Sequence, residues 1–172
     1  IAEAGQLALG YFNNRGSLTI QSKGVQDMAS EADLNTELLI KRRLAEAFPE
    51  DAFLGEETGR SEFAEGQGIW VVDPIDGTQP FIVGLTSWCV SIAFVQHGKV
   101  QFGMVYAPAR DELFAGGAGQ GATLNGQPIK ASAASAVNQG LIGAGFSPKS
   151  GVEVFLPAFE LFLKAGGMFY RD

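Results

Sequence analysis

Two aspartates, a glycine and a threonine stand close together in the stretch WVVDPIDGT at residues 70–78. Asp73 and Asp76 supply carboxylates, and hard divalent cations such as Mg²⁺ prefer oxygen ligands of this kind. Gly77 permits close approach of the backbone, and the N–H groups of Gly77 and Thr78 at a turn can face an anion. Carboxylates suited to a metal beside amides suited to phosphate indicate phosphate-ester hydrolysis.

A second pair of carboxylates, Glu56 and Glu57, follows a short strand predicted over residues 52–55. If three carboxylates approach within ~4 Å, each like-charge pair costs roughly 4 kcal/mol at an effective dielectric near 20. Arg60 alone cannot offset that cost, whereas a divalent cation can. The alternative is that the carboxylates diverge into solvent, and the residues by themselves leave both arrangements open.

Asp33 lies at or just inside the start of a helix predicted over residues 34–48. A carboxylate there has an ordinary structural role, because it satisfies free N–H groups and the helix dipole. The chemical alternative is that Thr78 orients a water molecule and Asp33 accepts its proton.

The predicted strands must bring these carboxylates and Thr78 close together. Residues 69–72 are β-branched and aromatic, which favours a buried strand, and Pro74 has no N–H, so we expect the chain to leave the sheet there. The apolar runs 88–95 and 100–106, joined at His97-Gly98, predict an antiparallel pair. His97 and Cys89 are interpreted as structural residues rather than as catalytic ones.

Helices are predicted where apolar residues recur at roughly 3.6-residue spacing, over residues 1–14, 34–48 and 152–164. The apolar stripe of the second helix consists of Leu34, Leu38, Leu39, Leu44 and Phe48. The combination predicts an α+β protein whose sheet is antiparallel or mixed and is flanked by helices.

The charge of the chain is unevenly distributed. The net charge is −7, and from Glu46 to Thr78 nine acidic side chains stand against one base, Arg60, so that this window carries −8. An acidic surface argues against general binding to nucleic-acid backbones. No apolar run reaches the ~18 residues of a membrane span, and the single cysteine excludes an internal disulfide framework. We therefore expect a protein of the reducing cytoplasm.

Several motifs together resemble the inositol monophosphatase family of Mg²⁺-dependent, lithium-sensitive phosphatases. They are Lys23, ASEAD (29–33), GEE (55–57), WVVDPIDGT (70–78), the run from Phe81 to Phe94, FGMVYAP (102–108) and GxGxGA (117–122). The resemblance implies an α+β layered helix/sheet sandwich of the inositol monophosphatase/fructose-1,6-bisphosphatase type, mainly its N-terminal half. It also implies hydrolysis of a small phosphate monoester.

The same resemblance implies a set of metal ligands. Glu57 and Asp73 would bind one Mg²⁺ together with the carbonyl of Ile75, and Asp73 would bridge to a second ion held by Asp76. Glu56 would lie behind these ligands. The family implies two or three Mg²⁺ ions, with Mn²⁺ as a substitute.

Roles in catalysis and phosphate binding are implied in the same way. Thr78 and Asp33 would activate the water nucleophile, Gly77 and Thr78 would contact the phosphate, and Lys23, in a predicted turn, would lie near the entrance of the metal site. The reaction would be direct in-line attack by water.

One departure from the family concerns the substrate. The family has Thr-Asn or an equivalent pair after DGT, whereas this chain has Gln79-Pro80. The change alters the wall beside the phosphate, so histidinol phosphate and 3′-phosphoadenosine nucleotides stay open as substrates beside inositol monophosphate.

A second departure concerns extent. The family has a second half with a WDxAAG-type aspartate that completes the second metal site, and the chain reaches Asp172 about where that half is expected. We therefore expect residues 1–172 to be the N-terminal, metal-binding portion of a phosphatase domain. A non-catalytic metal-binding or assembly module is the alternative, and family members are commonly homodimers.

Overall fold

The computed structural model describes residues 1–24, 27–143, 145–146 and 151–169, with the side chains of residues 21–24 and 27–29 outside the description. The chain divides into two compact units, Ile1–Lys130 and Ala131–Asp172. The helices and strands of the first unit follow one another in the order α1 (Ala2–Asn13), the 3₁₀ helix η1 (Arg15–Ser17), β1 (Ile20–Gly24), β2 (Asp27–Ser30), α2 (Glu31–Ala47), β3 (Ala52–Gly55), β4 (Gly59–Arg60), β5 (Ile69–Asp76), α3 (Thr78–Val83), β6 (Cys89–Gln96), β7 (Lys99–Ala107), β8 (Glu112–Gly117), β9 (Gly121–Leu124) and β10 (Gln127–Ile129).

Eight strands of the described chain form one sheet in the order β10-β9-β8-β7-β6-β5-β3-β4. β3 and β5 run parallel, and the other neighbouring pairs run antiparallel. The predicted hairpin is confirmed, since β6 pairs with β7 across His97 and Gly98, both at positive φ. The α+β class with a mixed, mostly antiparallel sheet is therefore confirmed.

The prediction that the chain leaves the sheet at Pro74 is wrong. β5 continues to Asp76, with its pairing to β6 shifted in register between Asp73 and Asp76. A register shift leaves residues out of the ladder, so a proline that cannot donate a hydrogen bond is tolerated there. The strand is thus carried past Pro74.

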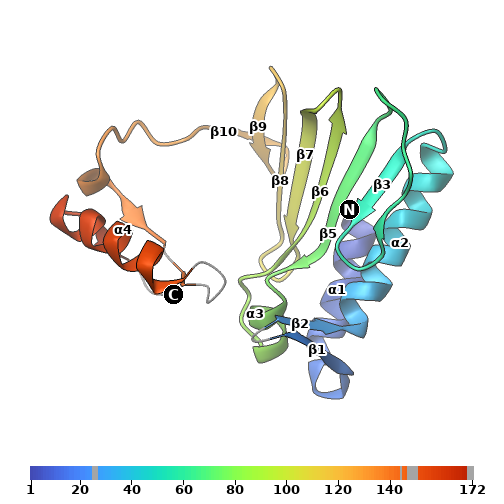
Figure 1. Ribbon diagram of the computed structural model, residues 1–172, viewed down its shortest axis with the longest axis horizontal. Helices are drawn as coiled ribbons and strands as arrows, with labels where there is room; N and C mark the ends of the chain where they lie inside the picture. The colour runs from blue at the N-terminus through green and yellow to red at the C-terminus, as the bar shows by residue number, and fades with distance from the viewer. Residues whose placement is uncertain (25–26, 144, 147–150, 170–172) are drawn as a thin grey trace. The chain divides into compact units, whose positions relative to one another are not determined.

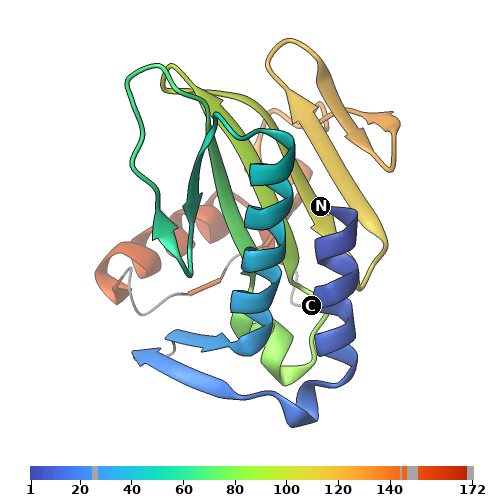
Figure 2. The same ribbon diagram turned by 90° about the vertical axis from the view of Figure 1, so that its right-hand side faces the viewer.

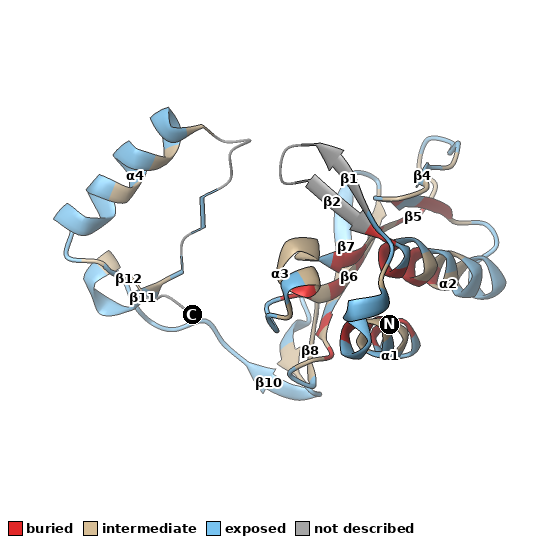
Figure 3. Ribbon diagram, turned by 90° about the horizontal axis from the view of Figure 1, so that it is seen from below, coloured by how far each residue is buried: buried red, intermediate tan, exposed pale blue. Residues whose placement is uncertain are grey.

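Helices α1 and α2 lie side by side over one face of the sheet (Figures 1 and 2). They pack on the inward side chains of two neighbouring strands, Trp70 and Val72 of β5 and Val90 and Ile92 of β6, all of which are buried. The buried residues line the contact between these two layers (Figure 3). The layering places the ends of β3 and β5 against α2.

Helix α2 places only part of its predicted apolar stripe against the core, since Leu39 and Leu44 pack there. Leu34 and Leu38 are 43% and 46% exposed. The buried residues are Ala32, Asp33, Thr36, Glu37 and Ile40. Small and polar side chains therefore share the core-facing side of this helix with apolar ones such as Ile40.

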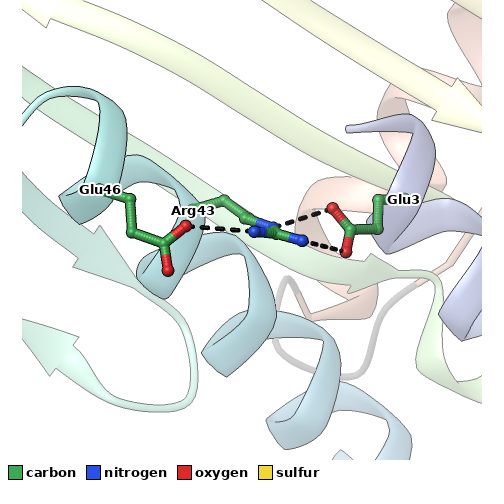
Figure 4. Close-up of polar contacts among 3 residues, drawn as sticks. All are labelled: Glu3, Arg43 and Glu46. Atoms are coloured by element: carbon green, nitrogen blue, oxygen red, sulfur yellow. Dashed lines mark hydrogen bonds and ion pairs between the residues drawn. The ribbon is translucent and has the colours of Figure 1, made fainter.

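An exposed ion pair joins the two helices. The Arg43 guanidinium of α2 donates to both carboxylate oxygens of Glu3 in α1, at 2.8 and 3.0 Å, and to Glu46 at 3.2 Å (Figure 4). The hydrogen bond from Arg43 holds the pKa of Glu3 below its usual value. This contact links α1 and α2 at the surface.

The second unit is small. It contains the 3₁₀ helix η2 (Val137–Gln139), the parallel pair β11 (Leu141–Ile142) and β12 (Met168–Phe169), and α4 (Val152–Lys164). The helix predicted over 152–164 is confirmed. The part of the chain that the structure describes holds no helix with the length and apolar content needed to cross a membrane.

Candidate active site

The candidate site is built at the end of β5. Ile75 is fully buried and Asp76 is exposed. The Ile75 carbonyl faces the hydroxyl of Thr78, with 3.2 Å between the two oxygens. The register shift between Asp73 and Asp76 turns this short segment away from regular pairing with β6, which frees its oxygen atoms for other partners.

Gly77 makes the turn from β5 into α3. Its backbone has φ 98° and ψ 43°, a conformation that residues with a side chain rarely adopt. A Cβ at this position would lie 2.7 Å from the carbonyl oxygen of Ser87. Glycine is therefore required both by the conformation and by the close approach, and Thr78 begins α3 immediately after it.

Asp33 is the third residue of α2 and is 1% exposed. Its Oδ2 accepts hydrogen bonds from the backbone N–H of Ser30, at 2.8 Å, and from the Ser30 hydroxyl, at 2.7 Å. Its Oδ1 accepts from the Thr78 hydroxyl at 3.2 Å. The structural and chemical interpretations of Asp33 thus coexist, because one oxygen completes the helix cap and the other faces the candidate nucleophile-activating threonine.

Asp73 is a partly buried carboxylate whose negative charge lies beside other carboxylates. Burial raises its pKa to about 7, and the negative charges of Glu56 and then Asp76 add to the effect. Its Oδ1 is buried and has no hydrogen-bond partner among the described residues. A buried acceptor without a donor is costly, and a divalent cation would supply the missing partner and relieve the repulsion.

The turn after β3 separates the two glutamates. Glu56 lies close enough to Asp73 to share a hydrogen bond with it. The backbone N–H of Glu57 donates instead to Glu37, at 2.8 Å. Across the residues whose side chains are described, no three Asp, Glu, His or Cys side chains already converge on one ion position. The carboxylates therefore face one another without forming a closed ligand shell.

Glu37 is a residue of the site that the sequence interpretation missed. It is fully buried, and its two oxygens accept the N–H groups of Glu57 and Thr58, at 2.8 and 2.7 Å. The available signal was its spacing, since Glu37 stands four residues after Asp33 and hence on the same helix face. Leu34 and Leu38 had indicated a different buried face of α2, but both are exposed.

Lys23 does not lie in the predicted turn. It falls within β1, which pairs antiparallel with β2, and its side chain is outside the described part of the structure. A role for Lys23 near the entrance of the metal site stays a prediction.

A pocket of about 360 Å³ adjoins the end of β5. Its lining includes Asp76, Gly77, Trp88, Cys89 and Arg110. Burial raises the pKa of the Cys89 thiol to about 11, with the charges of Asp76 and Asp73 contributing further. The thiol is protonated at neutral pH, which agrees with the interpretation of Cys89 as a structural residue rather than a nucleophile.

Comparison with known proteins adds a family. The model of the Inositol monophosphatase family matches residues 1–158. The chain is 33% identical over 168 residues to a protein of Neisseria meningitidis serogroup B named putative Nus factor SuhB, which covers 95% of this chain and 64% of that protein. It is 40% identical over 131 residues to a histidinol-phosphatase of Chlorobaculum parvum, covering 76% of this chain and 50% of the relative.

The fold is also found among solved structures. The extragenic suppressor protein suhB of Bartonella henselae superposes with a TM-score of 0.92 at 30% identity, over 98% of this chain and 66% of that one. The chain thus spans between half and about two thirds of the length of these three proteins.

Proposed function

Because the chain belongs to the inositol monophosphatase family, we propose that the protein hydrolyses a small phosphate monoester in a Mg²⁺-dependent reaction. The observation that carries the proposal is the buried, unpartnered Oδ1 of Asp73, beside Glu56 and Asp76, at the end of the strand that leads to Thr78. Repelling carboxylates with an orphaned oxygen fit a hard cation better than they fit solvent.

The donors proposed for the metal are the carboxylates of Asp73 and Asp76 and the carbonyl of Ile75. A glutamate of the turn after β3 completes the set from this chain. The resemblance implied Glu57 for that place, and the position of Glu56 beside Asp73 favours Glu56 instead. When bound, Mg²⁺ would neutralise the carboxylates and stabilise the charge on the phosphoryl oxygens.

The chain's own groups supply the proton transfer. The Thr78 hydroxyl, 3.2 Å from Asp33 Oδ1, is placed to orient a water molecule and to pass its proton toward the buried carboxylate. Gly77 has no side chain to obstruct the phosphate, so that the phosphate can approach its N–H group and that of Thr78. Water attacks in line, without a covalent phosphoenzyme.

The substrate is proposed to be inositol monophosphate or a related sugar or alcohol phosphate. Its alcohol portion would meet the wall formed by Gln79 and Pro80, and histidinol phosphate and 3′-phosphoadenosine nucleotides are the alternatives. The similarity to a histidinol-phosphatase supports the first of these alternatives. A panel of these esters, assayed for phosphate release with Mg²⁺ and with EDTA, distinguishes them.

Asp76→Asn in the full-length protein serves as the control in that panel. We expect the variant to lose Mg²⁺-dependent phosphate release, and near-normal turnover would contradict the role proposed for Asp76. Inhibition by Li⁺ is expected as well.

We also propose that residues 1–172 are the N-terminal metal-binding portion of the phosphatase domain and that the protein forms a homodimer.

A second candidate function is a non-catalytic role in an assembly. It is favoured by the similarity to a protein named as a putative Nus factor. Mg²⁺ binding measured by calorimetry beside the ester panel separates the two functions. Binding without turnover of any ester would favour the assembly role.

A further inference from the structure

We propose that Glu37 is a positioning residue for the metal site, which holds the turn of residues 56–58 so that the carboxylate of Glu56 faces Asp73. The inference rests on the proposed metal-dependent function and extends it to a residue that contacts neither metal nor substrate.

Both carboxylate oxygens of Glu37 accept hydrogen bonds from the turn of residues 56–58. Oε2 accepts the N–H of Glu57 at 2.8 Å, and Oε1 accepts the N–H of Thr58 at 2.7 Å. Two consecutive amides bound to the two oxygens of one carboxylate fix the peptide planes on either side of Glu57. Since the first of those planes begins at Glu56, the position of the Glu56 Cα is set as well.

Burial makes this arrangement rigid. Glu37 is fully buried, and charge-assisted hydrogen bonds are strong where water is excluded. The backbone of β3 presses on the carboxylate, because a Cβ at Gly55 would lie 2.4 Å from the carboxyl carbon of Glu37. Any side chain at position 55 would displace the carboxylate from the turn.

Helix α2 contacts both parts of the candidate site, the turn of residues 56–58 and the start of α3 at Thr78. Asp33, Glu37 and Lys41 recur at four-residue intervals and therefore lie along one helix face. Asp33 accepts from the Thr78 hydroxyl, and the Lys41 ammonium donates to the Thr58 hydroxyl at 3.2 Å. β3 and β5, which end at the two loops, are parallel neighbours in the sheet. Helix α2 thus sets the position of the turn of residues 56–58 relative to Asp73, Asp76 and Thr78.

Glu37→Gln in the full-length protein tests the proposal. The variant keeps the shape of the side chain but removes its charge and one of its acceptor oxygens. We expect Mg²⁺ affinity, measured by titration calorimetry, to fall about tenfold or more, as it does when groups that orient metal ligands are removed. We also expect hydrogen exchange at the amides of Glu57 and Thr58 to accelerate, and turnover to recover in part at high Mg²⁺ concentration.

Two further variants keep the test decisive. Gly55→Ala should weaken Mg²⁺ binding while Glu37 itself is kept, because the added methyl group would lie 2.4 Å from the Glu37 carboxyl carbon and would displace the carboxylate from the two amides. Ile40→Val, on the same buried face of α2, should lower thermal stability and leave Mg²⁺ affinity unchanged. A purely structural role for Glu37 would make its variant behave like Ile40→Val.

The outcomes separate the inference from the proposed function. Unchanged Mg²⁺ affinity in Glu37→Gln or in Gly55→Ala, or an equal loss in Ile40→Val, would overturn the positioning role. If Mg²⁺ binds the wild type and is lost in the Glu37 and Gly55 variants while no ester is hydrolysed, the positioning role stands and the phosphatase function fails. A wild type that does not bind Mg²⁺ would overturn both.

Discussion

The Thr78 hydroxyl lies 3.2 Å from Oδ1 of Asp33, a contact that joins the first residue of α3 to the first turn of α2. The other oxygen of Asp33 is held by Ser30, so the carboxylate cannot rotate freely. Thr78 therefore meets an acceptor of fixed orientation, as proton transfer from a water molecule at the hydroxyl requires.

Replacement of Thr78 by valine should abolish this proton path while keeping the shape of the side chain. We expect phosphate release to fall by about 100-fold or more, because general base catalysis contributes factors of this size. Thr78→Ser, which retains the hydroxyl, should keep most of the turnover. Mg²⁺ affinity, measured by calorimetry, should change little in either variant, and equal turnover in the valine and serine variants would contradict the role.

The two glutamates of the turn after β3 should differ in their effect on the metal. Glu56→Gln removes the carboxylate that faces Asp73, so we expect Mg²⁺ affinity to fall at least about tenfold, equivalent to about 1.4 kcal/mol. Glu57→Gln keeps the backbone N–H that donates to Glu37 and should have the smaller effect. Calorimetric titration of both variants decides between them, and a larger loss in the Glu57 variant would restore the assignment implied by the resemblance.

The proximity of several candidate site residues could be predicted from the sequence because these residues are nearly contiguous. Asp73, Asp76, Gly77 and Thr78 stand at fixed, short spacings, and their local geometry follows from the strand end and the glycine. Asp33 was identified at a helix start, where its position limits the roles it can have. The structure brings Asp33 to Thr78.

The features that could not be predicted depend on tertiary packing. Pro74 indicated a strand end, but the register shift beside β6 accommodates it. Leu34 indicated the buried face of α2, yet it is exposed, whereas the carboxylates of Asp33 and Glu37 are buried. Periodicity reports where apolar residues recur, and it cannot report that a helix buries charge for a neighbouring loop.

The contribution of Asp73 to the stability of the metal-free protein should fall as the pH rises from about 4 to about 7. The pKa of Asp73 is about 7 in the folded protein and near 3.8 when unfolded, so the folded state retains a proton that the unfolded state releases in this range. The stabilisation is complete below pH 4 and is lost as the pH passes 7. Thermal unfolding in EDTA should show this slope for the wild type, reduced in Asp73→Asn.

Saturating Mg²⁺ is the control for that slope, because a bound cation favours the charged carboxylate and removes the raised pKa. We expect the difference between the wild type and Asp73→Asn to reverse in sign above pH 7, where the wild type alone gains stability from the metal. A wild type whose pH dependence in EDTA matches that of Asp73→Asn would contradict the raised pKa.

Cys89 should react slowly with iodoacetamide. Its pKa of about 11, against 9.0 for an unperturbed thiol, leaves about a hundredfold less thiolate at pH 8, and thiolate is the reactive form. Peptide mapping by mass spectrometry follows the modification of this residue, with urea-unfolded protein as the reference. Asp76→Asn removes one of the charges that raise the pKa and should therefore accelerate alkylation, and an unchanged rate would contradict that cause.

Gly77→Ala should damage the site more than an ordinary substitution of a turn glycine. Gly98 provides the matched control, because it also has a positive φ, of 70°, but a Cβ there would meet nothing within 4 Å. Gly98→Ala should cost about 1–2 kcal/mol from backbone strain alone. Gly77→Ala adds the contact with the Ser87 carbonyl at 2.7 Å, so either the start of β6 or the first turn of α3 must shift. Because that turn begins with Thr78, we expect urea unfolding to show the larger loss of stability and phosphate release to fall only in the Gly77 variant. Equal losses of stability and activity in the two variants would mean that the close approach at Gly77 does not position the catalytic threonine.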